Sequence, residues 1–392
     1  MLQEVEKIFF ELLRFEVLET ELSDGVKSLI TPSVLPTLFM LSKRHDLAHL
    51  IGDALEKHGL LPENSKIKER FLNEKNVAIY RLAQLSYEYE RVCGVLEELK
   101  VKYIPLKGIV IRKLYPQNCL RTSADVDILI DKNSLKEVIK TLTEKLNYTY
   151  ETTDAYNAIV VSPNGVHVEL HFDLITKYDS EVSNKILSEV WEHSKQLKNS
   201  YKHLMNDDYF YYYHLAHMAR HFIDGGCGVK PFIDLWLLNN KICFNKEDRN
   251  ELLIKGELLQ FEKACNLLSK IWLEGLEHSN ETLALQNYLL KGGVFGSSDN
   301  KILINQGKKG GRFKYVTSRI FMPLEKMQHR YAVLKRHKWL YPFFVIVRCF
   351  EVLFKGDSTR IKNELKTSAQ ITGAEQENVE LLINYLGLKN RL

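Results

Sequence analysis

The chain of 392 residues is 45% hydrophobic and 27% charged, a balance that excludes a globally disordered, collagen-like or low-complexity protein. Its 54 lysines and arginines against 50 aspartates and glutamates leave a net charge of +4, which by itself does not indicate a nucleic-acid-binding protein. The six cysteines form no C-x-x-C pair, which argues against a zinc ribbon or a disulfide framework and favours a cytoplasmic location.

The N-terminal segment lacks the features of a secretory signal, because it carries repeated glutamates and no basic stretch ahead of an apolar core. The longest apolar run, near Trp339, is interrupted by Arg348, well short of the roughly 20 residues that cross a bilayer. We therefore expect no transmembrane helix.

Apolar residues in the first hundred positions have helical spacing, clearest from Val77 to Leu99, where they recur at alternating steps of three and four. After Lys100 we predict a strand in KYIPLKG, a short helix in IVIRKLY that Pro116 stops, and a second strand in ADVDILI. We then predict a helix in DKNSLKEVIKTLTEKLN and two strands around a turn at 163–165 in NAIVVSPNGVHVELHFDL. This alternation is typical of a small α/β domain.

Helical patterns return at Asp207 and continue to Gly292, where GGVFGSSDN is the strongest candidate for a linker. The expected fold class is therefore α+β, with a mixed β-sheet core flanked by helical N-terminal and C-terminal regions. We divide the chain into a helical N-terminal region (1–75), an α/β core (76–206), a helical domain (207–292) and a basic, aromatic-rich helical C-terminal region (293–392).

Two carboxylates lie in the predicted strand ADVDILI. Asp125 and Asp127 are two residues apart, so a strand places them on one face about 7 Å apart. Unpaired carboxylates beside an apolar strand are costly to bury, and a divalent metal such as Mg²⁺ would compensate them. The alternative is a solvated sheet edge, or pairing of the two acids with Arg112 or Arg121.

The strand in GVHVELHFDL has one apolar and one polar face, because its residues alternate strictly. The polar face consists of His167, Glu169, His171 and Asp173. Glu169 could supply a third metal ligand. The H-x-E-x-H pattern could also bind Zn²⁺, although zinc proteases place their histidine pair on a helix.

A phosphate-binding turn is predicted at Lys107 and Gly108, where a strand ends and a helix begins. Backbone N–H groups at such a helix start can donate hydrogen bonds to phosphate, and the Lys107 ammonium could add a positive charge. The alternative is a plain connection with a solvated lysine.

Together, the LKG turn (106–108), the LYP stop (114–116), Arg121, the run SADVDILI and the later HVELH resemble the nucleotidyltransferase superfamily. The closest resemblance is to the uncharacterised nucleotidyltransferase family, from about Asn76 to Leu238. It implies Mg²⁺- or Mn²⁺-dependent transfer of a nucleoside monophosphate from an NTP, by in-line displacement between two metal ions. By position, it assigns the catalytic and metal-binding acids to Asp125, Asp127 and Glu169, and nucleotide binding to Lys107, Gly108, Arg121, Ser123, His171 and Lys230.

One departure from the superfamily pattern lies in the turn, where Ile109 rather than glycine or serine follows Gly108. We therefore expect no side-chain hydroxyl beside the turn. This keeps open a second interpretation, a catalytically silent nucleotide-binding or regulatory protein of the same fold. The acceptor is also open, and could be a small molecule, a protein or RNA, the last in an RNA-directed nucleotidyltransferase.

Three histidines lie within one arc of the predicted helix in YHLAHMARHFID, at His214, His217 and His221, with Asp224 close by. The helix could close the nucleotide site, with Lys230 and Asp234 nearby. Alternatively, the histidines are packed and hydrogen-bonded between helices.

The region from Lys301 to Phe350 is strongly basic, with twelve lysines and arginines against the single acid Glu325, a local charge of about +11. Aromatic residues are interleaved with these cations, a mixture suited to single-stranded nucleic acid or to an anionic lipid surface. A solvated basic face over an aromatic core is the alternative.

Overall fold

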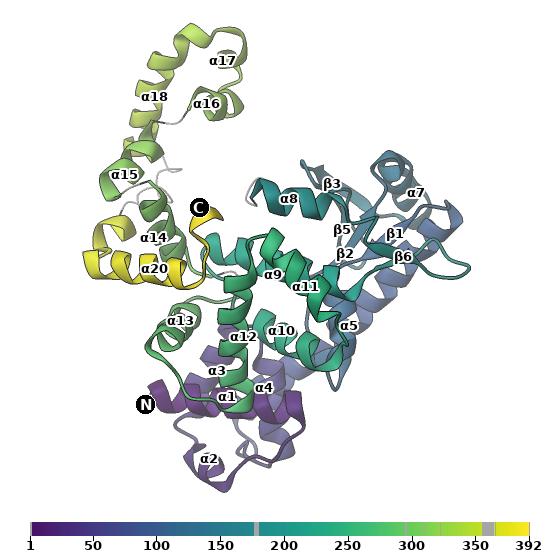
Figure 1. The fold of residues 1–392 in the computed structure, drawn as a ribbon, viewed down its shortest axis with the longest axis vertical. Coiled ribbons are helices and arrows are strands. Elements are labelled where there is room, and N and C mark those ends of the chain that lie inside the picture. Colours follow the sequence, from purple (N-terminus) through teal and green to yellow (C-terminus); the bar gives the residue numbers. More distant parts are fainter. Residues whose placement is uncertain are drawn as a thin grey trace.

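The computed structural model describes residues 2–175, 180–294, 296–309, 311–321, 323–354, 364 and 366–391. It is a mixed α+β protein in which helices surround a five-stranded sheet (Figure 1), as the sequence predicts. The domain boundaries at 75, 206 and 292 remain predictions.

The N-terminal helices are α1 (Leu2–Leu18), α2 (Asp24–Leu29), α3 (Leu35–Arg44) and α4 (Ala48–Lys57). They lead into the long helix α5 (Lys66–Glu98), which contains the predicted helix and begins where the Ser65 hydroxyl accepts a hydrogen bond from the Lys68 backbone N–H. Phe71 near its start packs with the N-terminal helices, whereas Val92 and Leu96 near its end pack under the sheet. Helix α5 therefore joins two hydrophobic cores.

The central sheet has the strand order β1-β2-β5-β4-β3. Strands β2 and β5 are parallel and the other neighbours are antiparallel. The strands are β1 (Tyr103–Pro105), β2 (Asp125–Ile130), β3 (Thr149–Thr153), β4 (Asn157–Val161) and β5 (His167–His171). The helical elements between them are α6 (Gly108–Ile111), η1 (Arg112–Leu114), η2 (Asn118–Leu120), η3 (Lys132–Ser134) and α7 (Leu135–Leu146). The predicted strand–turn–helix order and the hairpin at 163–165 are confirmed.

After α8 (Glu181–Ser188), a two-stranded sheet forms from β6 (Ser194–Gln196) and β7 (His203–Met205). The helices that follow are α9 (Asp207–Ile223), α10 (Lys230–Lys241), α11 (Lys246–Lys255), α12 (Leu259–Glu274) and α13 (Asn280–Lys291). They share one core with the N-terminal helices, because α12 packs against α1 and the rings of Phe10 and Trp272 stack 4.6 Å apart. Regions that are remote in sequence thus form one helical body.

The C-terminal region contains α14 (Ser298–Lys308), α15 (Arg312–Ile320), α16 (Leu324–Arg330), α17 (Val333–Arg336), η4 (Lys338–Leu340) and α18 (Tyr341–Phe354), followed by α20 (Gly373–Tyr385) and η5 (Lys389–Arg391). Helix α20 packs against α13 and α14, whereas α15 to α18 project away from the rest of the molecule (Figure 1). The predicted linker connects α13 to α14 in close contact with the α9–α10 loop. A Cβ atom on Gly296 would lie 2.0 Å from the Gly225 carbonyl oxygen, so only glycine fits there.

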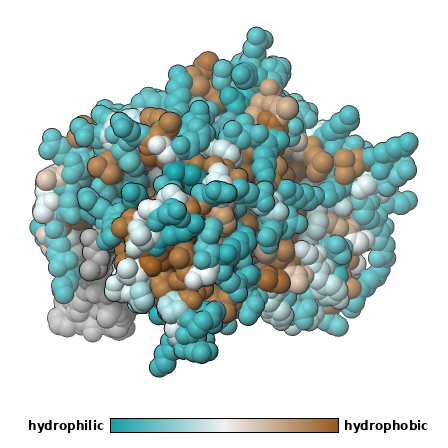
Figure 2. Space-filling model, turned by 90° about the horizontal axis from the view of Figure 1, so that it is seen from below, coloured by the Kyte–Doolittle hydropathy of each residue, from teal (hydrophilic) through white to brown (hydrophobic). Residues whose placement is uncertain are grey.

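Hydrophilic side chains cover most of the face in Figure 2, and hydrophobic side chains form separate patches between them. Within the described ranges, no helix has the length and apolar character needed to cross a membrane.

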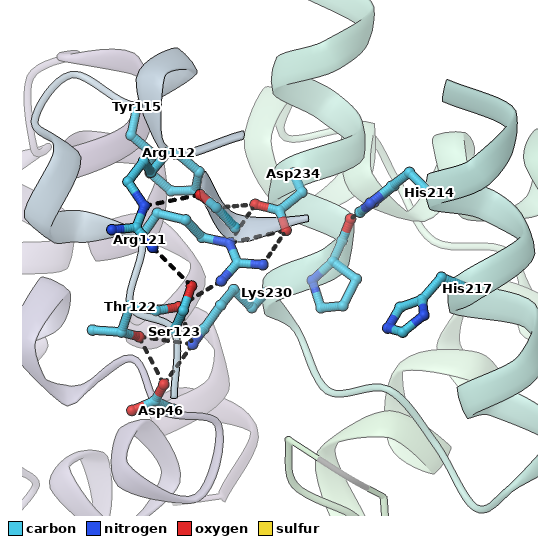
Figure 3. A network of polar contacts seen from close by, with 12 residues as sticks. Asp46, Arg112, Tyr115, Arg121, Thr122, Ser123, His214, His217, Lys230 and Asp234 are labelled. Atoms are coloured by element: carbon cyan, nitrogen blue, oxygen red, sulfur yellow. Dashed lines mark hydrogen bonds and ion pairs between the residues drawn. The ribbon is translucent and has the colours of Figure 1, made fainter. Parts of the chain in front are cut away.

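A buried ion pair joins the sheet region to α10 (Figure 3). The Arg121 guanidinium donates to both oxygens of Asp234 at 2.8 Å, and the Tyr115 hydroxyl donates to the same carboxylate at 2.8 Å. Asp234 is fully buried, so its charge depends on these protein partners.

We predict that Asp234→Ala lowers the free energy of unfolding by about 3–5 kcal/mol, because it leaves the Arg121 charge buried and unpaired. Chemical denaturation measures this loss. Glu98→Ala is the control, because the Glu98–Lys145 pair is more than half exposed and its loss costs at most about 1 kcal/mol. Equal losses in the two variants would contradict a stabilising role for the buried pair.

Candidate active site

The two central strands place acidic side chains next to each other. Because β2 and β5 are parallel, their register pairs Asp125 with His167 and Asp127 with Glu169. Apolar neighbours such as Val126 and Val168 point into the core, so the acids share the opposite face. The expected convergence of Asp127 and Glu169 is therefore a direct result of strand register.

Asp127, Glu169 and His171 form a compact cluster at this face. One ligand atom from each lies within 4.8 Å of the other two. His171 Nε2 is 2.9 Å from Asp127 Oδ1 and 3.1 Å from Glu169 Oε2, and the Asn157 amide donates to Glu169 at 3.0 Å. Two carboxylates and an imidazole in this arrangement could hold a divalent cation.

Lys107 is the built-in counter-ion of the cluster. Its Nζ lies 2.6 Å from Asp127 Oδ1. Burial alone would raise the pKa of Asp127, but the charge of Lys107 and the hydrogen bonds from His171 and Lys107 hold that pKa well below its usual range. Burial would lower the pKa of His171, yet its contacts with Asp127 and Glu169 raise it. The buried acid is thus ionised and available as a ligand.

Asp125 lines the same cleft but is not part of the compact cluster. Burial, followed by the nearby charge of Asp127, raises the pKa of Asp125 to about 6. The alternative that Arg112 or Arg121 pairs with the two acids is wrong. Arg121 pairs with Asp234, while Arg112 donates to the Gly108 carbonyl at 2.9 Å and to Ser123.

The turn before α6 has an unusual backbone. Lys107 has φ +47° and ψ −123°, a conformation that L-residues rarely adopt and that is costly without support from the surrounding structure. Gly108 packs directly against Ser123, because a Cβ atom there would lie 2.1 Å from Ser123 Oγ and would displace that hydroxyl. The expectation of no hydroxyl beside this turn is therefore wrong, since Ser123 supplies one from a distant point in sequence. Because α6 has only four residues, Lys107 is the main positive group of the turn.

A cleft of about 570 Å³ lies between the sheet, α9 and α10, and it is lined on the sheet side by Lys107, Gly108, Ser123, Asp125, Asp127 and Glu169. Its acidic wall comes from β2 and β5. Helix α9 supplies Tyr213, His217, Arg220 and His221 to the facing wall. The cleft therefore has carboxylates on one side and the Arg220 charge with polar side chains on the other, which suits a polyphosphate bound together with a metal ion.

The sequence left two interpretations of the α9 histidines, that they close the nucleotide site or that they pack between helices, and the three residues differ in this respect. His214 is packed and donates from Nε2 to the Pro231 carbonyl at 3.1 Å, as the packed alternative expects. His217 and His221 are only partly buried and their Nε2 atoms lie 3.0 Å apart. Arg220 donates to His217 Nδ1 at 2.8 Å, and since arginine cannot accept, His217 must donate from Nε2 to His221. Burial lowers the pKa of His217 well below normal and that of His221 to about 4.

The two other predicted cations, Arg121 and Lys230, also border the cleft but are already engaged (Figure 3). Lys230 Nζ lies 2.5 Å from Asp46 and donates to the Thr122 hydroxyl at 2.8 Å. Burial lowers the pKa of Lys230, while the Asp46 carboxylate opposes that shift. These contacts fix the segment 121–123, which carries Ser123 to the turn.

The zinc interpretation of the H-x-E-x-H face is not supported by its first histidine. His167 is half exposed and lies 3.7 Å from Glu151, away from the compact cluster. Only His171 joins Glu169 and Asp127.

A family model described as uncharacterised nucleotidyltransferase matches residues 35–273, more than half of the chain. The chain belongs to this nucleotidyltransferase family. The protein is therefore an enzyme that transfers phosphorus-containing groups, and the family implies a nucleoside triphosphate substrate. No curated protein matches the chain. The matched segment runs from α3 to α12 and includes both walls of the cleft.

Sequence reasoning did not identify three residues that line the cleft, namely Asp46, Tyr213 and Arg220. Arg220 had a detectable signal, because it follows His217 by three residues on the same helix. Asp46 had none, since it lies in the α3–α4 loop and reaches the cleft only through tertiary packing.

We predict that Mn²⁺ raises the melting temperature of the protein and that Asp127→Asn or Glu169→Gln removes the increase. At about 100 times the dissociation constant, binding to the folded state stabilises it by about 2.7 kcal/mol. Differential scanning fluorimetry measures the increment relative to each variant's own metal-free value. Glu151→Gln on the exposed strand β3 is the control and should keep the full increment. An unchanged increment in the two cluster variants would contradict metal binding at this cluster.

Proposed function

We propose that the enzyme transfers a nucleoside monophosphate from an NTP to an acceptor in the cleft between the sheet and α9. Mg²⁺ or Mn²⁺ would be held by Asp127, Glu169 and His171, with Asp125 beside them. The observation that carries this proposal is the juxtaposition of two carboxylates on neighbouring parallel strands with a wall that contains Arg220 across one cleft. When bound, the cation would offset phosphate charge and favour ionisation of an acceptor hydroxyl.

Lys107 has two roles in this proposal. Without a cation it neutralises Asp127 across 2.6 Å. If a cation took over that role, the ammonium would be free to contact a phosphate oxygen of the NTP. Lys107 makes its contact with Asp127 from a positive-φ position in the turn before α6.

The α9 wall would bind the phosphate tail on the side away from the acids. Arg220 carries a permanent charge and would be the main phosphate-binding group of this wall, because both ring nitrogens of His217 are hydrogen-bonded to Arg220 and His221. His221 would complete this wall. Glu169, hydrogen-bonded to Asn157, could alternatively accept the proton from the acceptor hydroxyl.

The cleft volume lies within the range of small-molecule sites, about 300–1,000 Å³. It therefore suits a nucleotide together with the reacting group of an acceptor. The acceptor itself could be a small molecule, a protein side chain or an RNA end.

We predict that Asp127→Asn and Glu169→Gln each lower the rate of nucleotide transfer at least about 100-fold, since losing even an outer-shell partner of a metal ligand typically costs 10–100-fold. The assay follows pyrophosphate release and label transfer from each of ATP, GTP, CTP and UTP with Mg²⁺ or Mn²⁺.

Glu151→Gln should transfer at the wild-type rate, and circular dichroism should confirm that all variants are folded. If the wild-type protein binds an NTP in calorimetry but releases no pyrophosphate with any acceptor extract, the silent nucleotide-binding interpretation replaces the proposed activity. Retained transfer in Asp127→Asn would contradict the assignment of that residue.

A further inference from the structure

The projecting segment α15–α18 exposes unusually large apolar side chains. Phe313 is 81% exposed, Trp339 is 76% exposed and Phe343 is 60% exposed. Ile346 and Val333 are also exposed. Exposed apolar side chains mark an interaction site when several of them share one face.

Trp339, Phe343 and Ile346 form a single stripe, which we call the apolar stripe. They are separated by steps of four and three residues and continue from η4 into α18, so they lie on one side of the helix. The segment has a hydrophobic core of its own, and the apolar stripe is not part of it. Val345, Leu334 and Met327 are buried together on the other side, with Leu340 and Phe344 packed against them. The segment therefore has a small core of its own and a second apolar face that the described residues leave uncovered.

Basic side chains adjoin the apolar stripe. Lys335, Arg336 and Lys338 are all exposed, and they directly precede it in η4 and α17. Between Lys301 and Phe350 the sequence contains only one acid, Glu325. The partner of this face should therefore be anionic, and it must also accept the apolar side chains.

An anionic lipid surface fits this combination better than nucleic acid. Nucleic acid would use the aromatic rings for stacking, but it has no hydrocarbon phase to receive Ile346 or Val333. A bilayer accepts aliphatic and aromatic side chains alike, and phospholipid head groups attract adjacent lysine and arginine. At 14 residues, α18 is too short to span a bilayer but long enough to lie in its interface.

We propose that this surface docks the enzyme on the face of an anionic phospholipid bilayer. Trp339, Phe343 and Ile346 insert among the acyl chains near the head groups, while Lys335, Arg336 and Lys338 contact the lipid phosphates. Docking lies outside the family match, which ends at residue 273, and does not depend on the cleft. It would hold the cleft close to a membrane, because α14, which leads to the projecting segment, is joined to the end of α9 by the Lys301–Asp224 ion pair at 2.7 Å.

The test is co-sedimentation of the full-length protein with vesicles of phosphatidylcholine alone or of phosphatidylcholine with 30% phosphatidylserine. We expect binding to the anionic vesicles, little binding to the neutral ones, and weakening when the salt concentration is raised. Lys335→Glu/Lys338→Glu should reduce the partition coefficient on the order of 100-fold or more, because each basic residue near such a surface contributes about a factor of five. Phe343→Ser/Ile346→Ser should reduce it by at least about tenfold.

Two matched control variants keep the test specific. Lys136→Glu/Lys140→Glu changes the charge on α7 equally, and Leu283→Ser/Leu381→Ser removes two exposed leucines from α13 and α20. Both should bind as the wild type does, and unchanged melting temperatures should show that all variants are folded. Trp339 should report insertion by a blue shift of its fluorescence with anionic vesicles, and the shift should be lost in Trp339→Phe while binding remains.

Three results would overturn the proposal. The first is equal vesicle binding by the projecting-segment variants and the controls. The second is binding of single-stranded RNA, abolished by the same variants, without any binding to vesicles. The third is a dimer in light scattering that Phe343→Ser/Ile346→Ser dissociates, again without vesicle binding. None of these outcomes bears on nucleotide transfer, which is measured separately with soluble substrates.

Discussion

The site depends on keeping Asp127 ionised where water is largely excluded. Asp127 is 3% exposed and belongs to a strand whose other face is hydrophobic core. An isolated charge there would be expelled or neutralised by protonation. Lys107 and His171 prevent this by direct contact with Asp127. Lys107 lies in the turn after β1, the antiparallel neighbour of β2, and His171 ends β5, its parallel neighbour. The acid, its counter-ion and its ligand partners are therefore consequences of one sheet topology.

A second buried charge network holds the opposite side of the cleft. Arg121 with Asp234, and Lys230 with Asp46, connect the segment after η2 to α10 and to the α3–α4 loop. These cations were expected to bind nucleotide, but in the structure their donors are directed to protein acids. Arg121 and Lys230 shape the edge of the cleft instead. They fix the segment 121–123, which places Ser123 against Gly108. Breaking such a buried pair is costly, because the remaining charge is left without a partner.

Much of this arrangement follows from local patterns in the sequence. The alternation in GVHVELHFDL and the spacing of Asp125 and Asp127 identify two strands and their polar faces, because side-chain direction in a strand has period two. The pairing of those strands in parallel register, which brings Asp127 opposite Glu169, depends on chain topology that no local pattern encodes. Ser123 was expected to bind nucleotide, but its place beside Gly108 was not predicted for the same reason, since fifteen residues separate it from the turn in sequence. Asp46 likewise reaches the cleft only because α5 and the N-terminal helices share a core with α9–α12.

Close backbone packing joins the α9–α10 loop, beside the cleft, to the start of α14, which leads to the projecting segment. Gly225 and Gly296 meet where the α9–α10 loop crosses the start of α14, at a separation that leaves no room for a Cβ atom. Val294, in the connection between α13 and α14, lines the cleft, and Lys301 one turn into α14 pairs with Asp224 at the end of α9. The close-packed backbone leaves little room for the start of α14 to move independently of the end of α9. Helix α9 carries His217, Arg220 and His221, so the start of α14 packs against the same helix that forms one wall of the cleft.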